Sequence, residues 1–480
     1  MQTKLRGILS LILAVLMMTT GMALAAEETP YDRTVDMLVI GGGVAGMTTA
    51  IEAADQGCES ILVVEKLGYT GGAAFVSDGI LGGYETQVTK ALDLHVDPKD
   101  MMADQMREKA YTLDPELTWI TTEKSGETID WLIDTVGVPF NPEVGLKPGY
   151  GNFEAIHTVA GKGAAMRAPY EAAIAARPAI AVETNSRATE LIYQDGVVSG
   201  AVVMQNDKPV RIGAKAVVLT TGGYAANREL FTRLHPANAV FQAGMMPGAT
   251  GDGLLMATAI GAGVNNAEQI QCYLREYENP TSQTPYMYTI FVNLAGQRFM
   301  DEKRIAQTYN QENRDALIMQ YGLQGADYFY SINDHAAMTQ FNLAEDAKTH
   351  AGVTIAETLD ELAAAIGVDA EGLKATVDAW NEMVKAQADT EFGRNTFFMP
   401  IAQGPFYALK TTFFASVCHG GITKNAKAEV TRFDGSAIPG LYAAGEVTAT
   451  TNSNGYTIST AITYGRIAAQ NAVEYMKTIG

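Results

Sequence analysis

The strongest pattern along the chain is a short apolar run that leads directly into a cluster of glycines. Residues 34–40 are apolar and rich in β-branched side chains, which predicts a buried strand of a parallel sheet. Glycines crowd residues 41–46, and the alanine-rich residues 44–56 predict a helix. A second apolar run at residues 60–64 predicts another strand. Strand, turn, helix and strand in this order are typical of an α/β fold.

Later apolar runs predict that this α/β domain is completed near the other end of the chain. Residues 217–223 predict a buried strand that ends in glycines, and residues 438–446 predict a turn and a short strand. Residues 457–473 predict a helix. We therefore expect a domain whose first part is N-terminal and whose last part is C-terminal.

The middle of the chain has a different character. Apolar residues at helical spacing in residues 354–386 predict two helices, the first beginning near Thr358. Residues 100–136 are also predicted to be mostly helical, and we expect Trp119 and Trp131 there to lie in the core.

The glycines after the first strand have the spacing of a dinucleotide-binding turn. Gly41, Gly43 and Gly46 form G-x-G-x-x-G, and Glu65 follows the second strand. Glycines let the backbone approach a pyrophosphate, and the helix N-terminus supplies partial positive charge. An acid at the position of Glu65 suits a ribose hydroxyl. The alternative is a glycine-rich turn without a ligand, but the strand, turn, helix, strand and acid in order favour the nucleotide.

The N-terminus has the three parts of an export signal. Lys4 and Arg6 precede an apolar run at residues 7–20, and an A-x-A site ends at Ala25. We expect residues 1–25 to be a cleaved signal peptide, which places the protein in the periplasm or another extracytoplasmic space. The alternative is a transmembrane anchor, but the apolar run is short and no span is expected after cleavage.

Composition excludes several classes of protein. The hydrophobic share of 47% permits a large core and excludes wholesale disorder. The 34 basic residues against 54 acidic residues give a net charge of −20, which argues against a nucleic-acid partner. Three cysteines allow at most one disulfide, and the histidines show no metal-ligand spacing, so no metal site is expected.

The motifs together resemble a known family. The first strand with its glycines, Thr220–Tyr224, Val292–Phe299 and Leu441–Glu446 occur in the order seen in the FAD-dependent fumarate reductase/succinate dehydrogenase flavoprotein superfamily. The chain is similar to its soluble, exported branch, which includes flavocytochrome c fumarate reductases, urocanate reductases and 3-ketosteroid dehydrogenases. The resemblance implies a split Rossmann-like FAD-binding domain in residues 26–240 and 395–480. An inserted α+β capping domain would occupy residues 241–394.

The resemblance also implies which residues bind the cofactor. No histidine occurs in residues 71–79, so FAD is expected to be bound without a covalent link. The expected FAD-binding residues are Gly41, Gly43, Val44, Ala45, Gly46, Glu65, Lys66, Gly71, Gly72, Ser77, Gly79, Ala188, Thr221, Gly222, Gly223, Asp252, His419, Gly445, Glu446, Thr457 and Ile458.

The expected substrate site departs from that of fumarate reductases. Tyr273 stands where the resemblance places a substrate histidine, and Asn452 stands where it places a clamp arginine. A bidentate arginine clamp makes a site selective for dicarboxylates, so fumarate is a poor candidate. Tyr273, Tyr288 and Asn452 are the expected substrate-binding residues. Tyrosines in this region could instead pack the interface between the two domains.

Three residues are candidates for catalysis. Arg304 follows the Arg298–Glu302 segment, where the resemblance places a proton-donating arginine, although it is two residues short of strict register. Tyr456 begins the last predicted helix, and His419 precedes Gly420, beside the flavin. A surface ion pair for Arg304 and a structural role for His419 are the alternatives.

We expect an exported reductase that transfers hydride from flavin N5 to an activated C=C bond. The substrate would be an α,β-unsaturated carbonyl or carboxylate that serves as a respiratory electron acceptor. The alternatives are a dehydrogenase of a cyclic ketone and an electron-transfer flavoprotein without catalysis. The chain has no haem motif and no second nucleotide fingerprint, so electrons are expected from a separate cytochrome or flavin carrier.

Overall fold

The computed structural model describes residues 31–109, 111–145, 155–242, 246–267, 269–277, 290–302, 311–340, 342–350, 352–395, 399–449 and 455–479. The expected signal peptide lies outside these ranges and stays a prediction.

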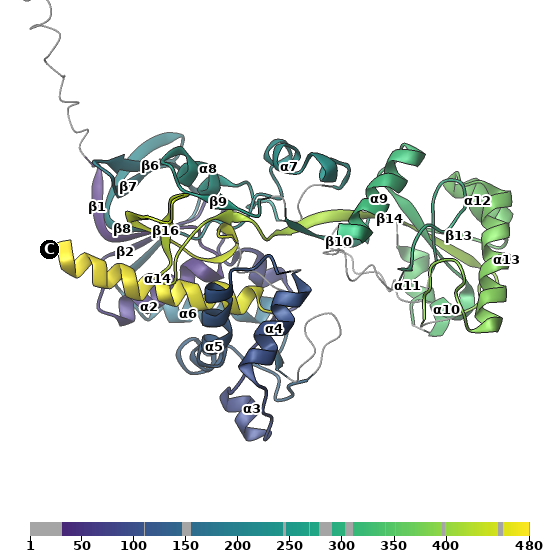
Figure 1. Ribbon diagram of the computed structural model, residues 1–480, viewed down its shortest axis with the longest axis horizontal. Coiled ribbons are helices and arrows are strands. Elements are labelled where there is room, and N and C mark those ends of the chain that lie inside the picture. The colour runs from purple at the N-terminus through teal and green to yellow at the C-terminus, as the bar shows by residue number, and fades with distance from the viewer. Residues whose placement is uncertain are drawn as a thin grey trace, which may run out of the picture.

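A mixed sheet of eight strands forms the centre of the larger lobe (Figure 1). Five of its strands run parallel, in the order β17 (Ala437–Ala443), β8 (Lys208–Leu219), β1 (Arg33–Ile40), β2 (Ile61–Val64) and β5 (Ile180–Glu183). Antiparallel strands complete the sheet: β16 (Glu429–Thr431) on β17, β7 (Val197–Gln205) on β8, and β6 (Ser186–Gln194) on β7. The α/β fold class, with a parallel sheet built from both ends of the chain, is confirmed.

Side chains of the central strands alternate between two buried clusters. Met37 and Val39 belong to one cluster, whereas Leu38 and Ile40 belong to the other. A strand that is buried on both faces has no polar side, which explains the continuous apolar run in the sequence.

Two helices pack across one face of this sheet. α2 (Val44–Asp55) and the C-terminal α14 (Thr457–Ile479) lie side by side, and Arg466 Nε donates to Glu52 Oε2 at 2.9 Å (Figure 1). A Cβ added at Gly465 would lie 2.8 Å from the Ala45 carbonyl oxygen, so the two backbones are in close contact. The first half of α14 therefore packs against the start of α2, next to the first glycine turn.

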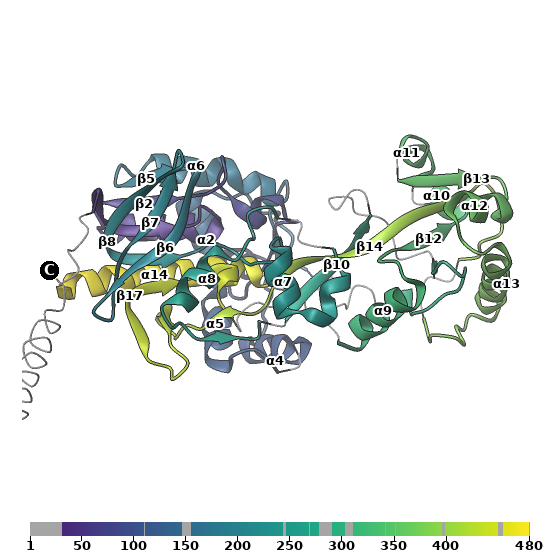
Figure 2. The same ribbon diagram turned by 90° about the horizontal axis from the view of Figure 1, so that it is seen from above.

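The smaller lobe contains a five-stranded antiparallel sheet. Its strands are β10 (Ile270–Glu276), β11 (Ile290–Val292), β12 (Phe329–Asn333), β13 (Val353–Ala356) and the long β14 (Phe406–Cys418). β14 runs from this lobe towards the larger one (Figure 2). It belongs to the C-terminal segment that we assigned to the FAD-binding domain, and the domain boundaries stay a prediction.

Helices α12 (Leu359–Ile366) and α13 (Ala370–Ala386) cover the smaller sheet at the positions predicted from helical spacing. Thr358 caps α12 and forms a reciprocal capping box with Glu361, which explains where the helix begins. The remaining elements are α3 (Gln87–Ala91), α4 (Pro98–Glu108), α5 (Pro115–Trp131), α6 (Arg167–Ala175), α7 (Arg228–Leu234), α8 (Asp252–Ala259), α9 (Gln311–Gln324), α10 (His335–Gln340), α11 (Ala344–Thr349), β3 (Ile80–Gly82), β4 (Ile156–Thr158), β9 (Val264–Asn265) and β15 (Gly421–Ile422).

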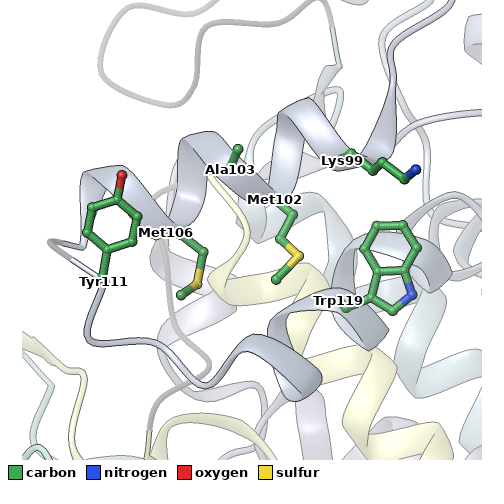
Figure 3. A pocket seen from close by; sticks show the side chains of 6 residues that line it. All are labelled: Lys99, Met102, Ala103, Met106, Tyr111 and Trp119. Carbon is green, nitrogen blue, oxygen red and sulfur yellow. The ribbon is translucent and has the colours of Figure 1, made fainter.

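Two local predictions need correction. The strand expected at residues 217–223 begins earlier and ends at Leu219, because the following residues turn towards the glycines after β1. Trp131 is buried as expected, but Trp119 is only partly buried. It lines an open cavity beside α4 together with Met102 and Met106 (Figure 3), so its predicted core position is wrong.

Candidate active site

The glycine turn between β1 and α2 is shaped by close backbone contacts. A Cβ added at Gly46 would lie 2.0 Å from the Gly41 carbonyl oxygen, and one added at Gly41 would lie 2.4 Å from the Thr220 carbonyl oxygen. Gly43 differs, because an added Cβ there would meet nothing within 4 Å. Gly43 is also the N-cap of α2, and no side chain caps this helix. The turn therefore leaves space and N–H donors for an anionic group.

Glu65 lies beside this turn. One oxygen of its carboxylate accepts a hydrogen bond from Gly42 N–H at 2.8 Å, and the other accepts from Leu67 N–H at 2.8 Å. Each oxygen keeps a further lone pair that could accept from a ribose hydroxyl. Gly71, a second expected contact, bridges to Gly43, and its N–H donates to Gly42 O at 2.8 Å.

The segment after Gly71 is held in a compact turn. Gly79 has a φ of +64°, and a Cβ there would lie 2.8 Å from the backbone nitrogen of Gly163. Ser77 Oγ donates to Ala74 O at 2.7 Å and accepts from Gly79 N–H at 3.1 Å. The expected FAD contacts Gly71, Gly72, Ser77 and Gly79 thus belong to one turn next to the first glycines.

Lys66 and Asp252 form an ion pair with each other. Lys66 Nζ lies 3.0 Å from Asp252 Oδ2, and Arg187 Nη2 lies 2.8 Å from Asp252 Oδ1. Burial alone would raise the pKa of Asp252, but the hydrogen bonds from Arg187 and Lys66 hold it below its usual value. Ala188, another expected contact, is buried next to Arg187 in β6. The roles of Lys66, Asp252 and Ala188 towards a cofactor stay predictions.

The residues after β8 approach the first glycines from the neighbouring strand. Thr220 Oγ1 donates to Gly41 O at 2.8 Å. Thr221 Oγ1 is buried and has no hydrogen-bond partner among the described residues. Gly222 has a φ of +73°, and a Cβ there would meet nothing within 4 Å. This edge of the sheet thus offers both open space and a buried hydroxyl.

Glu446 joins three distant segments at the same edge. Its Oε1 accepts a hydrogen bond from Cys418 N–H at 2.8 Å, and a Cβ added at Gly223 would lie 2.5 Å from that oxygen. Burial raises the pKa of Glu446 to about 7, although the hydrogen bond from Cys418 N–H acts in the opposite direction. Gly445 packs against Ala45 at the start of α2. The predicted FAD residues from both ends of the chain therefore meet here.

Thr457 and Ile458 begin α14, and Tyr456 precedes them. Tyr456 is 3% exposed and belongs to a small apolar cluster with Met101 and Ala155. Its ring lies where a side chain on Gly82 would otherwise be, since a Cβ there would come within 2.2 Å of it. The structure thus places this candidate proton donor in a packed position.

His419 follows β14 and contacts Lys109, a residue that the sequence did not indicate as part of the site. The His419 ring is buried, and its Nε2 lies 3.4 Å from Nζ of Lys109. Lys109 is itself 6% exposed. These two residues are 310 positions apart, so no local sequence pattern could have identified Lys109 as part of the site.

The remaining candidates divide into two groups. Tyr273 lies in β10, partly exposed, with the Arg275 guanidinium carbon 5.0 Å from its ring centroid. Its neighbour Tyr277 donates to Asp327 Oδ1 at 3.2 Å within the smaller lobe. Arg304, Tyr288 and Asn452 lie outside the described residues, so their expected roles stay predictions.

Two kinds of feature are absent from the described residues. Across those residues, no three His, Cys, Asp or Glu side chains are grouped as metal ligands would be. Within the same part of the chain, no helix has the length and hydropathy needed to cross a bilayer.

The residues at the edge of the larger sheet fit FAD. The uncapped α2 N-terminus and the open space at Gly43 suit the pyrophosphate, and Glu65 suits a ribose. Glu446 and the segment after β8 suit the remaining, uncharged part of the cofactor. When bound there, FAD would supply hydride transfer.

Comparisons with known proteins agree with this assignment. A family model described as an FAD binding domain matches residues 36–457. The chain is 30% identical over 469 residues to a fumarate reductase (cytochrome) of Shewanella frigidimarina, covering 94% of this chain and 79% of that protein. It is 29% identical over 480 residues to a urocanate reductase of Eggerthella lenta, covering 93% and 76%.

A solved structure shares the fold over almost the whole chain. The open conformation of a flavocytochrome c3 fumarate reductase is 26% identical and superposes with a TM-score of 0.82, covering 93% of this chain and 79% of that one. With the family model and the cofactor cradle, this establishes that the chain belongs to the FAD-binding family of the fumarate reductase flavoprotein superfamily and is an FAD-dependent oxidoreductase.

Proposed function

We propose that this flavoprotein reduces an activated C=C bond in a substrate other than fumarate. The observation that carries the proposal is the side chain at position 273. Tyr273 stands where the resemblance places a substrate histidine, and it is stacked by Arg275 within β10. A phenol can stack on a flat substrate and hydrogen-bond one polar group, but it cannot clamp a second carboxylate. We therefore infer a substrate with one carbonyl or carboxylate, with an aromatic or cyclic body.

The reaction needs one proton besides the hydride that bound FAD supplies from N5 to the β-carbon. Negative charge develops on the carbonyl or carboxylate oxygen as the hydride arrives, and the α-carbon then takes the proton. We propose Arg304 or Tyr456 as the donor. The packed position of Tyr456, which is 3% exposed, favours Arg304. His419 lines the same site.

The proposal includes the cellular setting. We infer export by the segment 1–25, non-covalent FAD, and reduction by a separate cytochrome or flavin carrier. We also propose that residues 26–240 and 395–480 bind FAD and that residues 241–394 cap the substrate. The substrate would then serve as an electron acceptor outside the cytoplasm.

Anaerobic reoxidation of the reduced protein tests the proposal. The chain lacking residues 1–25 is loaded with FAD, reduced with a viologen and mixed with fumarate, aryl enoates, simple enoates and enones. We expect fast reoxidation by an aryl or cyclic enoate or enone and slow reoxidation by fumarate. The fastest substrate should be slowed by Tyr273→Leu, whereas Tyr31→Leu, an exposed tyrosine in the larger lobe, should leave the rate unchanged.

The same experiment separates two other functions. Reduction of the oxidised flavin by a saturated cyclic ketone, without reoxidation by any alkene, would indicate a dehydrogenase. The tyrosine at position 273 also suits such a ketone. A flavin that cycles only with a protein partner would indicate an electron carrier.

A further inference from the structure

A lysine from a distant helix reaches into the site next to His419. Lys109 is the C-cap residue of α4, and its ammonium nitrogen lies 3.4 Å from Nε2 of His419. Both side chains are buried, at 6% and 4% exposure. A buried lysine loses the hydration of its charge, which favours the neutral amine unless other groups bind the charge.

The contact links the protonation states of Lys109 and His419. An ammonium group can only donate hydrogen bonds, so Nε2 of His419 accepts when Lys109 is protonated. His419 is then neutral and carries its ring proton on Nδ1. In that state the pair holds one positive charge, on Lys109, together with a ring N–H donor on His419.

Backbone-anchored hydrogen bonds hold the two residues together. Thr112 Oγ1 donates to Lys109 O at 2.6 Å, and Gln269 Oε1 lies 3.1 Å from the same hydroxyl. His419 N–H donates to Gln269 O at 2.9 Å, and Asn266 Nδ2 donates to Thr112 O at 2.8 Å. The turn after α4 is therefore attached to the segment that precedes β10 and to the residue after β14. The contact between Lys109 and His419 is therefore held by the backbone of both segments, unlike a contact between two mobile surface side chains.

The pair lies next to residues that we assign to the cofactor. His419 follows Cys418, whose sulfur lies 2.8 Å from the position of an added Cβ at Gly223 and whose N–H is bound by Glu446. On the resemblance, Tyr273 and Asn452 stand in place of a histidine and an arginine that bind carboxylates. Lys109 can supply positive charge opposite the substrate oxygen in addition to the proposed donor Arg304.

We propose that Lys109 is a positioning residue that supplies this charge: it orients His419 and stabilises the negative charge that develops on the substrate's carbonyl or carboxylate oxygen. The substrate part of this inference rests on the proposed function. The charge near the flavin does not, because a cation beside the ring also favours the reduced, anionic cofactor.

The flavin midpoint potential tests the charge without any substrate. Lys109→Met should move the potential to a more negative value, and Lys109→Arg, which keeps the charge, should restore most of it. Lys99→Met is the matched control, since it removes one positive charge from the exposed start of the same helix (Figure 3). It should leave the potential unchanged. An unchanged potential in FAD-loaded Lys109→Met would overturn this part.

Reoxidation kinetics test the substrate part. For the fastest alkene, Lys109→Met should lower kcat/KM about 10²-fold, as removal of an oxyanion donor does. His419→Gln should cost a similar factor, and the double variant should cost little more than either single one, since the two residues act together. Additive losses, or no loss, would refute the pairing.

The midpoint potential and the reoxidation rates distinguish a failure of the proposed function from a failure of the proposed role of Lys109. If no alkene reoxidises the wild-type protein, the proposed function fails, while the potential still decides whether Lys109 places charge at the flavin. FAD stoichiometry and the unfolding temperature show whether each variant is folded. If Lys109→Met does not fold, Lys109→Gln, which keeps a donor without the charge, gives the same test.

Discussion

The carboxylate of Glu446 accepts a hydrogen bond from the backbone N–H of Cys418, with 2.8 Å between the nitrogen and Oε1. Cys418 is the last residue of β14, which reaches the site from the smaller lobe, whereas Glu446 follows the parallel strand β17. One side chain thus attaches the strand between the lobes to the cofactor edge of the larger sheet. On our assignment, a hydroxyl of bound FAD would donate to the same carboxylate.

Glu446→Gln should weaken FAD binding about tenfold at pH 8, because hydrogen bonds to a charged acceptor contribute about 1.5–3 kcal/mol. Burial raises the pKa of this carboxyl to about 7, so the wild-type group is ionised at pH 8 and mostly protonated at pH 6. Wild-type affinity should therefore fall from pH 8 to pH 6, whereas that of the variant should change little. FAD titrations at the two pH values measure both. The exposed Glu474→Gln serves as the control.

Gly43→Ala should separate FAD binding from folding. An added methyl group at Gly43 meets no protein atom within 4 Å, so the FAD-free protein should keep its unfolding temperature. The methyl group would enter the space that we assign to the pyrophosphate, and FAD should no longer raise the unfolding temperature. Gly322→Ala is the matched control, since a Cβ at Gly322 in α9 also meets open space.

Gly46→Ala should fail in a different way. Its Cβ would lie 2.0 Å from the Gly41 carbonyl oxygen, so the turn itself must move. We expect a lower unfolding temperature without FAD as well as lost FAD binding. If Gly43→Ala lowered the FAD-free unfolding temperature as much as Gly46→Ala does, the space at Gly43 would not be reserved for a ligand.

Local patterns predicted those parts of the molecule whose partners are close in sequence. The run at residues 34–40 became β1 because a strand buried on both faces must be apolar throughout. The start of α12 was visible because Thr358 and Glu361 cap each other within one turn. The glycine turn was visible because the three glycines of its motif fall within six residues, and Gly46 packs against the Gly41 carbonyl oxygen.

Contacts between distant segments left no such signal. In the sequence, Lys109 is an ordinary lysine at the end of a helix. Only the packing of α4 beside His419 reveals their contact. The bond from Cys418 to Glu446 likewise depends on how β14 and β17 meet. Trp119 was placed in the core on its size alone, but nothing in the sequence indicates that α4 leaves it partly exposed.

Arg298→Met should destabilise the smaller lobe by about 3–5 kcal/mol, since it removes the guanidinium shared by two buried carboxylates and leaves Glu302 with Arg394 alone. Arg298 Nη2 lies 2.8 Å from Glu302 Oε2 and 2.9 Å from Asp389 Oδ2, and all three side chains are at most 1% exposed. Denaturant unfolding measures the loss. Lys385→Met removes an exposed lysine paired with Glu382 and should cost less than about 1 kcal/mol. Equal losses would mean that the buried network contributes no more than a surface pair.

Lys424→Met should stabilise the protein at pH 7 and remove part of its pH dependence. Lys424 is 7% exposed, with its Nζ 2.8 Å from Thr448 Oγ1 and 4.1 Å from the ring centroid of Tyr464. Burial lowers its pKa to about 7, against 10.5 for an ordinary lysine. Between these values the unfolded chain binds the proton more tightly than the folded one, so wild-type stability should rise with pH by at most about 1.4 kcal/mol per pH unit.

Denaturant unfolding at pH 7 and pH 9 should reveal this rise in the wild type and in the exposed control Lys427→Met, but a flatter dependence in Lys424→Met. If Lys424→Met were less stable than the wild type at pH 7, the hydroxyl and ring contacts would outweigh the lost hydration.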